Sequence, residues 1–172
     1  MACLTIHTFP DPILKKVCAP VKEVDEEVRR LIDEMAETMY AAPGSGLAAP
    51  QVGVDKRVIV YDTSPKSEPR ELVVLVNPEI VASGGDEIFM EEGCLSCPDL
   101  IMEIPRAEWI KVQGLDREGR PVTFETEDFP AIVIQHEIDH LNGQTLVDHL
   151  SSLKRSSYRR KQQRAKERDA AA

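Results

Sequence analysis

The segment FPAIVIQHEIDHLNG, from Phe129 to Gly143, decides the fold of this chain because it combines an apolar helix with ionisable side chains. Pro130 suits the first turn of a helix, and Gly143 suits the position just after its end. A short helix is therefore predicted from about Phe129 to Leu141. Its many aliphatic residues predict that the helix is buried in the core.

The same segment contains an H-E-x-x-H pattern. His136 and His140 are four residues apart, so on a helix both imidazoles point the same way and can share one metal ion. Glu137 is too close to His136 to serve as a third ligand, but it is well placed to hydrogen-bond a water on that metal. Such patterns also arise by chance, yet ionisable groups on a buried helix need partners to be tolerated. The pattern predicts metal-assisted hydrolysis with Glu137 as the general base.

Two apolar residues share the histidine face of this helix. Ile132 and Val133 precede His136 by four and three residues. We expect them to line an apolar, substrate-binding pocket beside the metal, of a kind that suits a methionine side chain.

Size and composition are typical of a globular protein. The chain has 172 residues, which favours one domain with a real core. It has no apolar run long enough for a membrane span, and its first residues do not resemble a signal peptide. Without an export signal, the four cysteines indicate reduced thiols or metal ligands. We expect a cytoplasmic protein.

Charge is distributed unevenly along the chain. The formal net charge is −9, but residues 151–172 hold eight Lys or Arg and two acidic residues, a balance of +6. Residues 1–150 therefore carry −15. We expect residues 1–150 to form a single catalytic domain and residues 151–172 to form a basic, helical tail. The positive charge of the tail leaves two interpretations: it binds a polyanion such as ribosomal RNA, or it is a solvated charged helix.

Other local patterns predict the remaining elements. Asp25 predicts the cap of a helix whose apolar residues keep helical spacing as far as Met39. Runs rich in β-branched residues predict strands over Arg57 to Thr63, Glu71 to Asn77, Asp86 to Met90, Ala107 to Leu115 and Arg120 to Thr126. Because these strands cluster before the H-E-x-x-H helix instead of alternating with helices, the predicted fold class is α+β.

Two cysteines, Cys94 and Cys97, are the further candidate ligands. If both bind the metal, the site is closed, with two thiolates and two imidazoles, and has a structural role. If one binds, the site keeps an open position for water. A redox dithiol is a third interpretation, but the flanking sequence lacks the strand and helix that this motif needs. Glu137 favours the open site, because a structural zinc requires no carboxylate beside its histidine.

Three stretches, taken together, resemble the peptide deformylase family. The family patterns G-x-G-L-A-A-x-Q, E-G-C-L-S and Q-H-E-x-D-H-L-x-G stand here, in order, as GSGLAAPQ (44–51), EGCLS (92–96) and QHEIDHLNG (135–143). The resemblance extends to FPDPILKKV, IPRAEWIKVQGLDREGRPV and LVDHLSSLKR, and so covers nearly the whole chain.

This resemblance implies a fold with mixed or antiparallel sheets around a central metal-binding helix. It implies removal of the N-formyl group from the formyl-methionine of newly made polypeptides, by attack of a metal-bound hydroxide. It also implies Cys94, His136 and His140 as ligands of one divalent metal ion per chain. Fe(II) is the ion expected, with zinc, nickel and cobalt as alternatives.

The resemblance further implies how the substrate is held. Gln51 and the backbone N–H of Leu95 would surround the formyl oxygen, and Gly46 would lie along the substrate chain. Glu137 would act as base and proton shuttle. The partners implied are N-formyl-methionyl nascent peptides and, through the C-terminal helix, the ribosome. Cys97 departs from the family, which usually has an apolar residue there, so its role stays open.

Two other functions compete with this one. The first is an H-E-x-x-H hydrolase that acts on a different amide, such as a peptidase. The second is a non-catalytic domain with a closed zinc site of two cysteines and two histidines, which binds partners through its tail. The stretch Gly44 to Gln51 argues against the second, because a structural zinc module needs no oxyanion donor.

Overall fold

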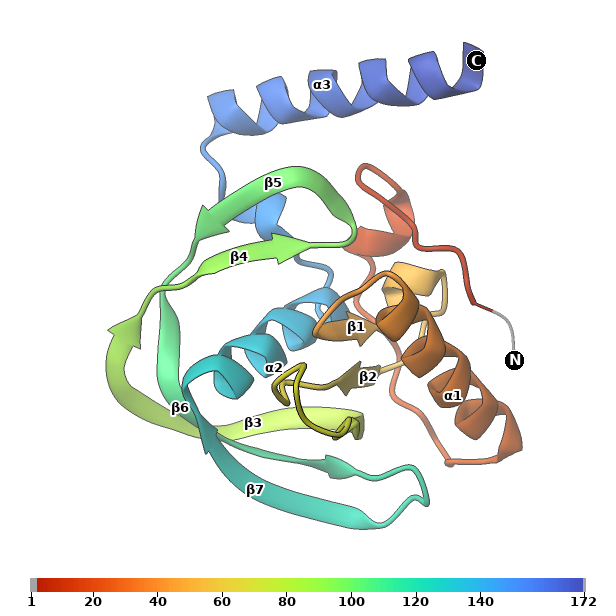
Figure 1. Cartoon of the computed structure of the whole chain (residues 1–172), viewed down its shortest axis with the longest axis vertical. Coiled ribbons are helices and arrows are strands. Elements are labelled where there is room, and N and C mark those ends of the chain that lie inside the picture. The colour runs from red at the N-terminus through yellow and green to blue at the C-terminus, as the bar shows by residue number, and fades with distance from the viewer. Residues whose placement is uncertain (1–2, 172) are drawn as a thin grey trace.

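The computed structural model describes residues 3–171 and places the H-E-x-x-H helix, α2 (Asp128–Leu141), at the centre of the molecule (Figure 1). A five-stranded sheet packs along this helix, and all neighbouring strands are antiparallel. In spatial order its strands are β1 (Gly46–Ala48), β2 (Val58–Tyr61), β3 (Val73–Ile88), β6 (Arg106–Leu115) and β7 (Pro121–Glu127).

A two-stranded hairpin, β4 (Glu91–Cys94) and β5 (Cys97–Glu103), forms a separate small sheet. It lies on the side of α2 away from β3 and β7 (Figure 1). The remaining helices are α1 (Glu26–Ala41), α3 (Ser152–Ala171) and three short 3-10 turns, η1 (Pro12–Lys15), η2 (Ala49–Val52) and η3 (Leu146–His149). The predicted α+β class is confirmed.

Helix α1 forms where the capping residue and apolar spacing predict it. The Asp25 carboxylate accepts a hydrogen bond of 3.0 Å from the Val28 N–H, which satisfies one of the free donors at the helix start. Its buried face, including Ile32, Met35 and Met39, packs into a cluster with residues of β1 and β2. The two methionines are core residues.

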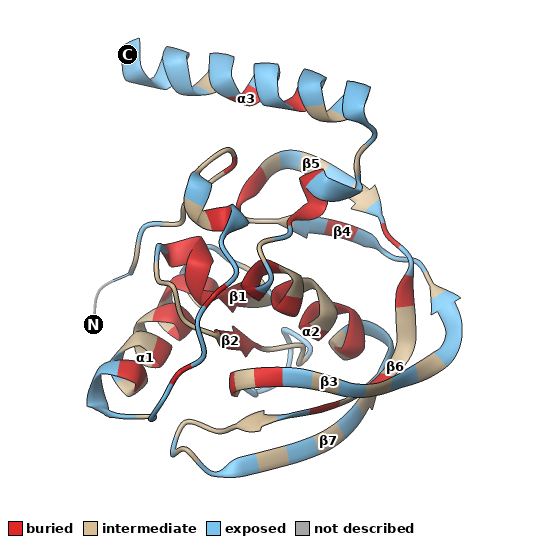
Figure 2. Ribbon diagram, turned by 180° about the vertical axis from the view of Figure 1, so that it is seen from behind, coloured by how far each residue is buried: buried red, intermediate tan, exposed pale blue. Residues whose placement is uncertain are grey.

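Helix α2 has two different faces. Ile134 and Leu141 on one face are fully buried against Ile59, Leu75 and Ile110 of the five-stranded sheet. This packing turns the face that carries the ionisable side chains toward the β4–β5 hairpin. From Ala131 to Leu141 the helix is buried or half-buried (Figure 2), so the polar groups on this part of it need hydrogen-bond partners or a ligand.

Two expectations about strands are corrected. Asp86 to Met90 is not a separate strand, because β3 runs unbroken from Val73 to Ile88. Its pairing with β6 shifts register at three places, and Gly85 has a positive φ of 80°. These bulges keep one bent strand continuous where the glycines suggested a break. The strands β4 and β5 were missed, since EEGCLSCP lacks both β-branched residues and clear alternation.

The C-terminal end of α2 is held by two contacts. The Arg57 guanidinium donates to the Leu141 carbonyl at 3.0 Å and to Asn142 Oδ1 at 3.0 Å. A cation at this end also complements the helix dipole. Gly143 follows with φ of 76°, and a Cβ there would collide with the backbone of Lys15. The N-terminal arm can therefore approach the helix end only because position 143 is glycine.

The predicted tail helix is present as α3. Tyr158 Oη and Gln162 Nε2 both donate to the Pro98 carbonyl, at 2.8 and 3.2 Å. The tail therefore rests on β5 through two buried side chains, while most of its other residues are exposed (Figure 2). Arg155 and Lys166 also donate to backbone carbonyls of the body, those of Leu150 and Thr8. No helix over residues 3–171 has the length and apolar character that crossing a bilayer requires.

Replacing Gly143 should destabilise the protein more than replacing another glycine of positive φ. Gly143→Ala forces both a strained backbone, costing about 1–2 kcal/mol, and a collision with Lys15. Gly119→Ala is the matched control, because φ there is 82° but a Cβ meets Val24 at an ordinary 3.5 Å. Urea unfolding at fixed metal concentration measures the difference. Equal losses in the free energy of unfolding for the two variants would show that the packing of the N-terminal arm against position 143 contributes nothing to stability.

Candidate metal centre and active site

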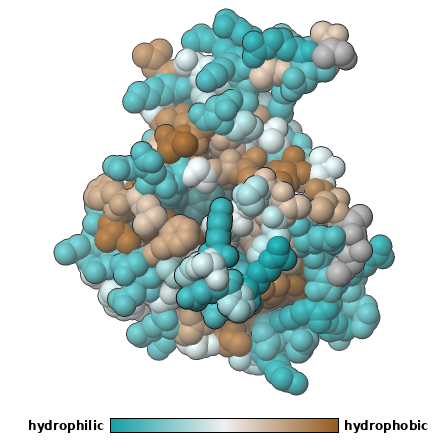
Figure 3. Space-filling model, viewed as in Figure 1, coloured by the Kyte–Doolittle hydropathy of each residue, from teal (hydrophilic) through white to brown (hydrophobic). Residues whose placement is uncertain are grey.

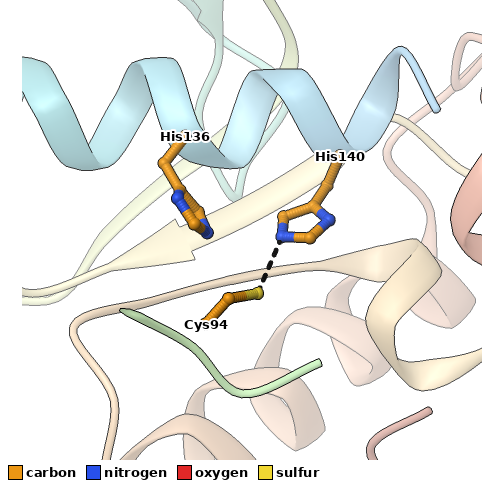
Figure 4. A group of neighbouring side chains, drawn as sticks. All are labelled: Cys94, His136 and His140. Carbon is orange, nitrogen blue, oxygen red and sulfur yellow. Dashed lines mark hydrogen bonds between the residues drawn. The ribbon is translucent and has the colours of Figure 1, made fainter. Parts of the chain in front are cut away.

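Three side chains from two elements converge beside α2. Cys94 comes from the end of β4, while His136 and His140 lie one turn apart on α2 (Figure 4). Their ligand atoms all lie within 4.8 Å of one another, and Cys94 Sγ is 3.2 Å from His140 Nε2. The spacing on the helix brings the imidazoles together, and only the hairpin brings the thiol to them.

This donor set fits a catalytic metal ion. One thiolate and two imidazoles match the three-ligand pattern that leaves a fourth position free, and donor atoms on one zinc lie roughly 3–4 Å apart. Burial lowers the pKa of His140 well below its ordinary value, so that imidazole is neutral and able to bind a cation. The residues present therefore fit a divalent transition metal.

The ring of His136 is oriented by a buried carboxylate. His136 Nδ1 lies 3.0 Å from Glu92 Oε1 and donates to it, which leaves the Nε2 lone pair free for the metal. Burial alone would lower the pKa of His136, but the bond to Glu92 raises it. Glu92 thus sets the tautomer of the ligand.

Arg106 holds Glu92 in turn. Its Nε and Nη2 donate to the two oxygens of Glu92 at 2.9 and 2.8 Å, a bidentate pair that is almost fully buried. Its Nη1 donates to Asp139 Oδ2 at 2.7 Å, which connects the pair back to α2. Burial opposes the charge of Glu92, yet the bonds from His136 and Arg106 hold its pKa below the ordinary value.

Glu137 lies at the wall of the cavity without a partner for one oxygen. The residue is 4% exposed, and its Oε2 has no hydrogen-bond partner among the described residues. Burial raises the pKa of Glu137 to about 7, so a proton can be taken up or given away near neutral pH. Gly46 lies against it, because a Cβ at position 46 would come within 2.8 Å of Glu137 Oε1.

Gln51 is fixed beside the ligands. Its Oε1 accepts from the Ala48 N–H at 2.9 Å, and its Nε2 donates to Ser96 Oγ at 3.1 Å. The same Nε2 lies 3.7 Å from Cys94 Sγ. The amide of Gln51 therefore presents its donor end to the metal side of the cavity.

A cavity of about 190 Å³ opens beside these groups. Its wall combines Ile132 and Val133 from α2 with Gly46 of β1, Gln51 of η2 and Leu95 of the β4–β5 turn. Met90 and Phe129 complete an apolar rim that sequence reasoning missed. The pocket can hold one unbranched apolar side chain next to the ligand trio.

Cys97 is not part of the ligand trio. It is buried beside Cys94 but falls outside the group whose donor atoms lie within 4.8 Å. The neighbouring Cys97 thiol, together with burial, raises the pKa of Cys94, whereas the Cys94 thiol lowers the pKa of Cys97. This arrangement supports the open site over the closed site with four protein ligands.

The supporting residues were not singled out as site residues from the sequence. Glu92 and Asp139 lie inside the family patterns, and Arg106 lies in the matching stretch IPRAEWIKVQGLDREGRPV, but none of the three was assigned a role. Ser96 likewise lay in a pattern without a role. A buried ionisable group needs a buried partner of opposite charge. Searching the family patterns for a carboxylate partner of His136 could therefore have identified Glu92.

The comparisons with known proteins agree on one protein family. The family model described as polypeptide deformylase matches residues 3–156. The peptide deformylase of Desulfosudis oleivorans is 47% identical over 164 residues, covering 95% of each chain. That of Thermodesulfovibrio yellowstonii is 50% identical over 161 residues, covering 94% of this chain and 97% of its own.

Solved structures agree with the sequence comparisons. A peptide deformylase from Legionella pneumophila superposes with a TM-score of 0.89 at 46% identity, covering 99% of both chains. A peptide deformylase from Ehrlichia chaffeensis, solved in complex with actinonin, gives a TM-score of 0.90 at 38% identity, covering 96% of this chain and 98% of its own. The similarity therefore includes the site and the tail.

Neutralising Glu92 should weaken metal binding. Glu92→Gln keeps the shape but removes the charge that orients His136, so we expect about a 10–100-fold loss of zinc affinity. Competition with a chromogenic chelator measures it. Glu103→Gln, an exposed carboxylate on the same hairpin, is the matched control. An unchanged affinity in Glu92→Gln would exclude the orienting role.

Proposed function

This chain belongs to the polypeptide deformylase family, and we propose that it carries out the family reaction with Glu137 as the base beside a metal held by Cys94, His136 and His140. The enzyme is a metal-dependent hydrolase that removes N-formyl groups from nascent peptides. The observation that supports Glu137 is its unpartnered oxygen in a buried cavity that includes Cys94 and His136.

The metal would supply Lewis acidity, which lowers the pKa of a bound water and polarises the formyl oxygen. Glu137 accepts a proton from the attacking water at its carboxylate. It then delivers this proton to the nitrogen that leaves as the free amino terminus. A pKa near 7 suits both transfers, because neither protonation state is strongly favoured at neutral pH.

The charge that develops on the formyl oxygen needs fixed donors. Gln51 Nε2 and the backbone N–H of Leu95 are proposed for this task, since both residues line the cavity next to Cys94. The bonds that Gln51 makes to Ala48 and Ser96 hold its amide in place before the substrate arrives. Donors that are already oriented cost no reorganisation when the charge appears.

The substrate enters as an N-formyl-methionyl chain. Ile132 and Val133 would contact the methionine side chain, and Gly46 would let the peptide backbone pass close to Glu137. For the metal we propose Fe(II), with zinc, nickel or cobalt as substitutes, because a mixed thiolate and imidazole set binds all of these borderline ions. The proposed place of action is the cytoplasm, where nascent chains are made.

Removing the base should abolish turnover without removing the metal. We expect Glu137→Gln to keep one metal per chain and to lose about 10²–10⁴-fold in kcat on formyl-methionyl peptides. Glu127→Gln, an exposed carboxylate just before the same helix, should retain activity. Anaerobic assays of Fe(II)-loaded protein follow amine release, with acetyl-methionyl peptides alongside. Full activity of Glu137→Gln would refute the assignment.

Enlarging the apolar pocket should reduce specificity for methionine. Ile132→Ala removes side-chain contact from the pocket, so kcat/KM for formyl-methionyl peptides should fall by at least about tenfold. Ile134→Ala is the matched control, because Ile134 is buried against the sheet on the opposite side of α2 and should reduce stability alone. Parallel loss of kcat/KM in both variants would point to a general defect of the helix.

The basic tail is proposed as a ribosome contact. Figure 3 shows that α3 presents a largely hydrophilic surface at one end of the molecule. Its cations Arg160, Lys161 and Arg164 are exposed, while Tyr158 and Gln162 face the body. The phosphate backbone of RNA attracts such a row of charges. The division into a catalytic domain, 1–150, and a tail, 151–172, stays a prediction.

Reversing charges on the outer face of α3 should weaken ribosome binding while leaving the fold intact. The triple change Arg160→Glu, Lys161→Glu and Arg164→Glu should reduce co-sedimentation with ribosomes at low salt by at least about tenfold. The matched control reverses three exposed cations elsewhere, namely Lys15, Lys66 and Arg120. An equal loss in both triple variants would indicate net charge, and no loss in the first would refute the tail contact.

A further inference from the structure

The two cysteines of the β4–β5 hairpin form a close pair that the proposed reaction uses only in part. Cys94 is the last residue of β4, Cys97 is the first residue of β5, and the strand register pairs them directly. Directly opposed residues of an antiparallel pair carry their side chains on the same face. The register therefore places both thiols on one face of the hairpin.

This geometry suits a disulfide. Directly opposed residues have Cα atoms about 4.5–5.5 Å apart, and disulfides accept about 4.4–6.8 Å. The tight turn at Leu95 and Ser96 can therefore stay in place when the sulfurs join.

An oxidant can reach the pair at Cys94, which is half-buried, whereas Cys97 is buried behind it. Both sulfur-bearing residues line a surface hollow whose outer wall includes Pro43, Asp99 and Ile101. Ile101 is 68% exposed, so the hollow opens to solvent. By contrast, Cys18 is buried in the main core and Cys3 lies at the surface beside α1. Among the described cysteines, the strand pairing joins Cys94 with Cys97 alone.

We propose that Cys94 and Cys97 are a peroxide-reactive dithiol, which closes to a disulfide and so removes the thiolate from the metal site. The Cys94 sulfur attacks one peroxide oxygen, the O–O bond breaks, and a sulfenic acid and one water form. The Cys97 thiol then attacks the sulfenic sulfur and displaces a second water. Two thiols and one peroxide give one disulfide and two waters.

Cys97 thereby protects its neighbour. A lone sulfenic acid at position 94 would be oxidised further to sulfinic and sulfonic acids, which thiols do not reduce. A disulfide is reduced by thiols, so the ligand can be regenerated. The pair therefore converts irreversible damage into a reversible loss of metal. The disulfide does not depend on the proposed function, whereas the release of metal rests on Cys94 being a ligand.

Peptide mapping of zinc-loaded protein tests the dithiol directly, and zinc is chosen because it has no redox chemistry of its own. After treatment with hydrogen peroxide and alkylation of free thiols, trypsin releases residues 71–106, which contain Cys94 and Cys97 and no other cysteine. We expect this peptide to be lighter by two hydrogens and unalkylated. A dye should detect one zinc released per disulfide, and dithiothreitol with added zinc should reverse both changes.

Two variants separate the dithiol from general oxidation. Cys97→Ala should show sulfinic and sulfonic acid at Cys94, and zinc lost from it should not rebind after dithiothreitol. Cys3→Ser is the matched control, which removes an exposed thiol and should behave like the parent chain. If Cys97→Ala does not fold, Cys97→Ser and the map of the parent chain decide. Sulfinic and sulfonic products without the disulfide in the parent chain, or reversible zinc loss in Cys97→Ala, would overturn the proposal.

Discussion

The buried ion pair between Arg106 and Glu92 is the interaction on which the metal site depends. Two charges removed from water cost several kcal/mol each, and only close, complete pairing offsets that cost. Here both carboxylate oxygens are used by Arg106 while one also accepts from His136. The network therefore joins β4, β6 and α2 at the point where a ligand must be aimed. Loss of Glu92 would leave Arg106 with Asp139 as its one carboxylate partner, and loss of Arg106 would leave the Glu92 charge with His136 alone.

A second constraint is that α2 serves as both core and catalytic element. Its sheet-facing side is packed to nearly zero exposure, which gives the helix a rigid seat. On its other side Glu137 and His140 are also buried, so both side chains are desolvated and their pKa values shift. Rigid ligands and a base of adjusted pKa thus follow from the same burial. The hydrogen bonds from Arg57 to Leu141 and Asn142 fix the position of α2 along its axis.

The β4–β5 hairpin closes the site from the opposite side. It delivers Cys94 to the two histidines, carries Leu95 at its turn and fixes Gln51 through Ser96. It also brings Cys97 beside Cys94, which adds redox chemistry to a site built for hydrolysis. One short hairpin therefore supplies a ligand, holds a donor and carries a second thiol. The tail contacts this hairpin through Tyr158 and Gln162, both bonded to Pro98.

By itself, the sequence determined the local elements and the chemical type of the site. Helical spacing placed His136, Glu137 and His140 on α2, Asp25 placed the start of α1, and the strand runs gave the α+β class. These features depend on neighbours within one turn or one strand, so a local pattern is enough to predict them.

The extent of β3 and the existence of the β4–β5 hairpin were not predictable in this way. A bulged strand and a short hairpin are stabilised by pairing with distant segments, and their own composition is weak. Spacing alone left open which cysteine joins the histidines, and only the family resemblance implied Cys94. The tertiary structure shows Cys94 beside the histidines, Arg106 and Glu92 orienting His136, and Cys97 paired with Cys94. The first two are contacts across many residues, where burial and pairing decide the outcome and local pattern carries no signal. Cys97 lies three residues from Cys94, but their pairing depends on the hairpin, which local pattern did not predict.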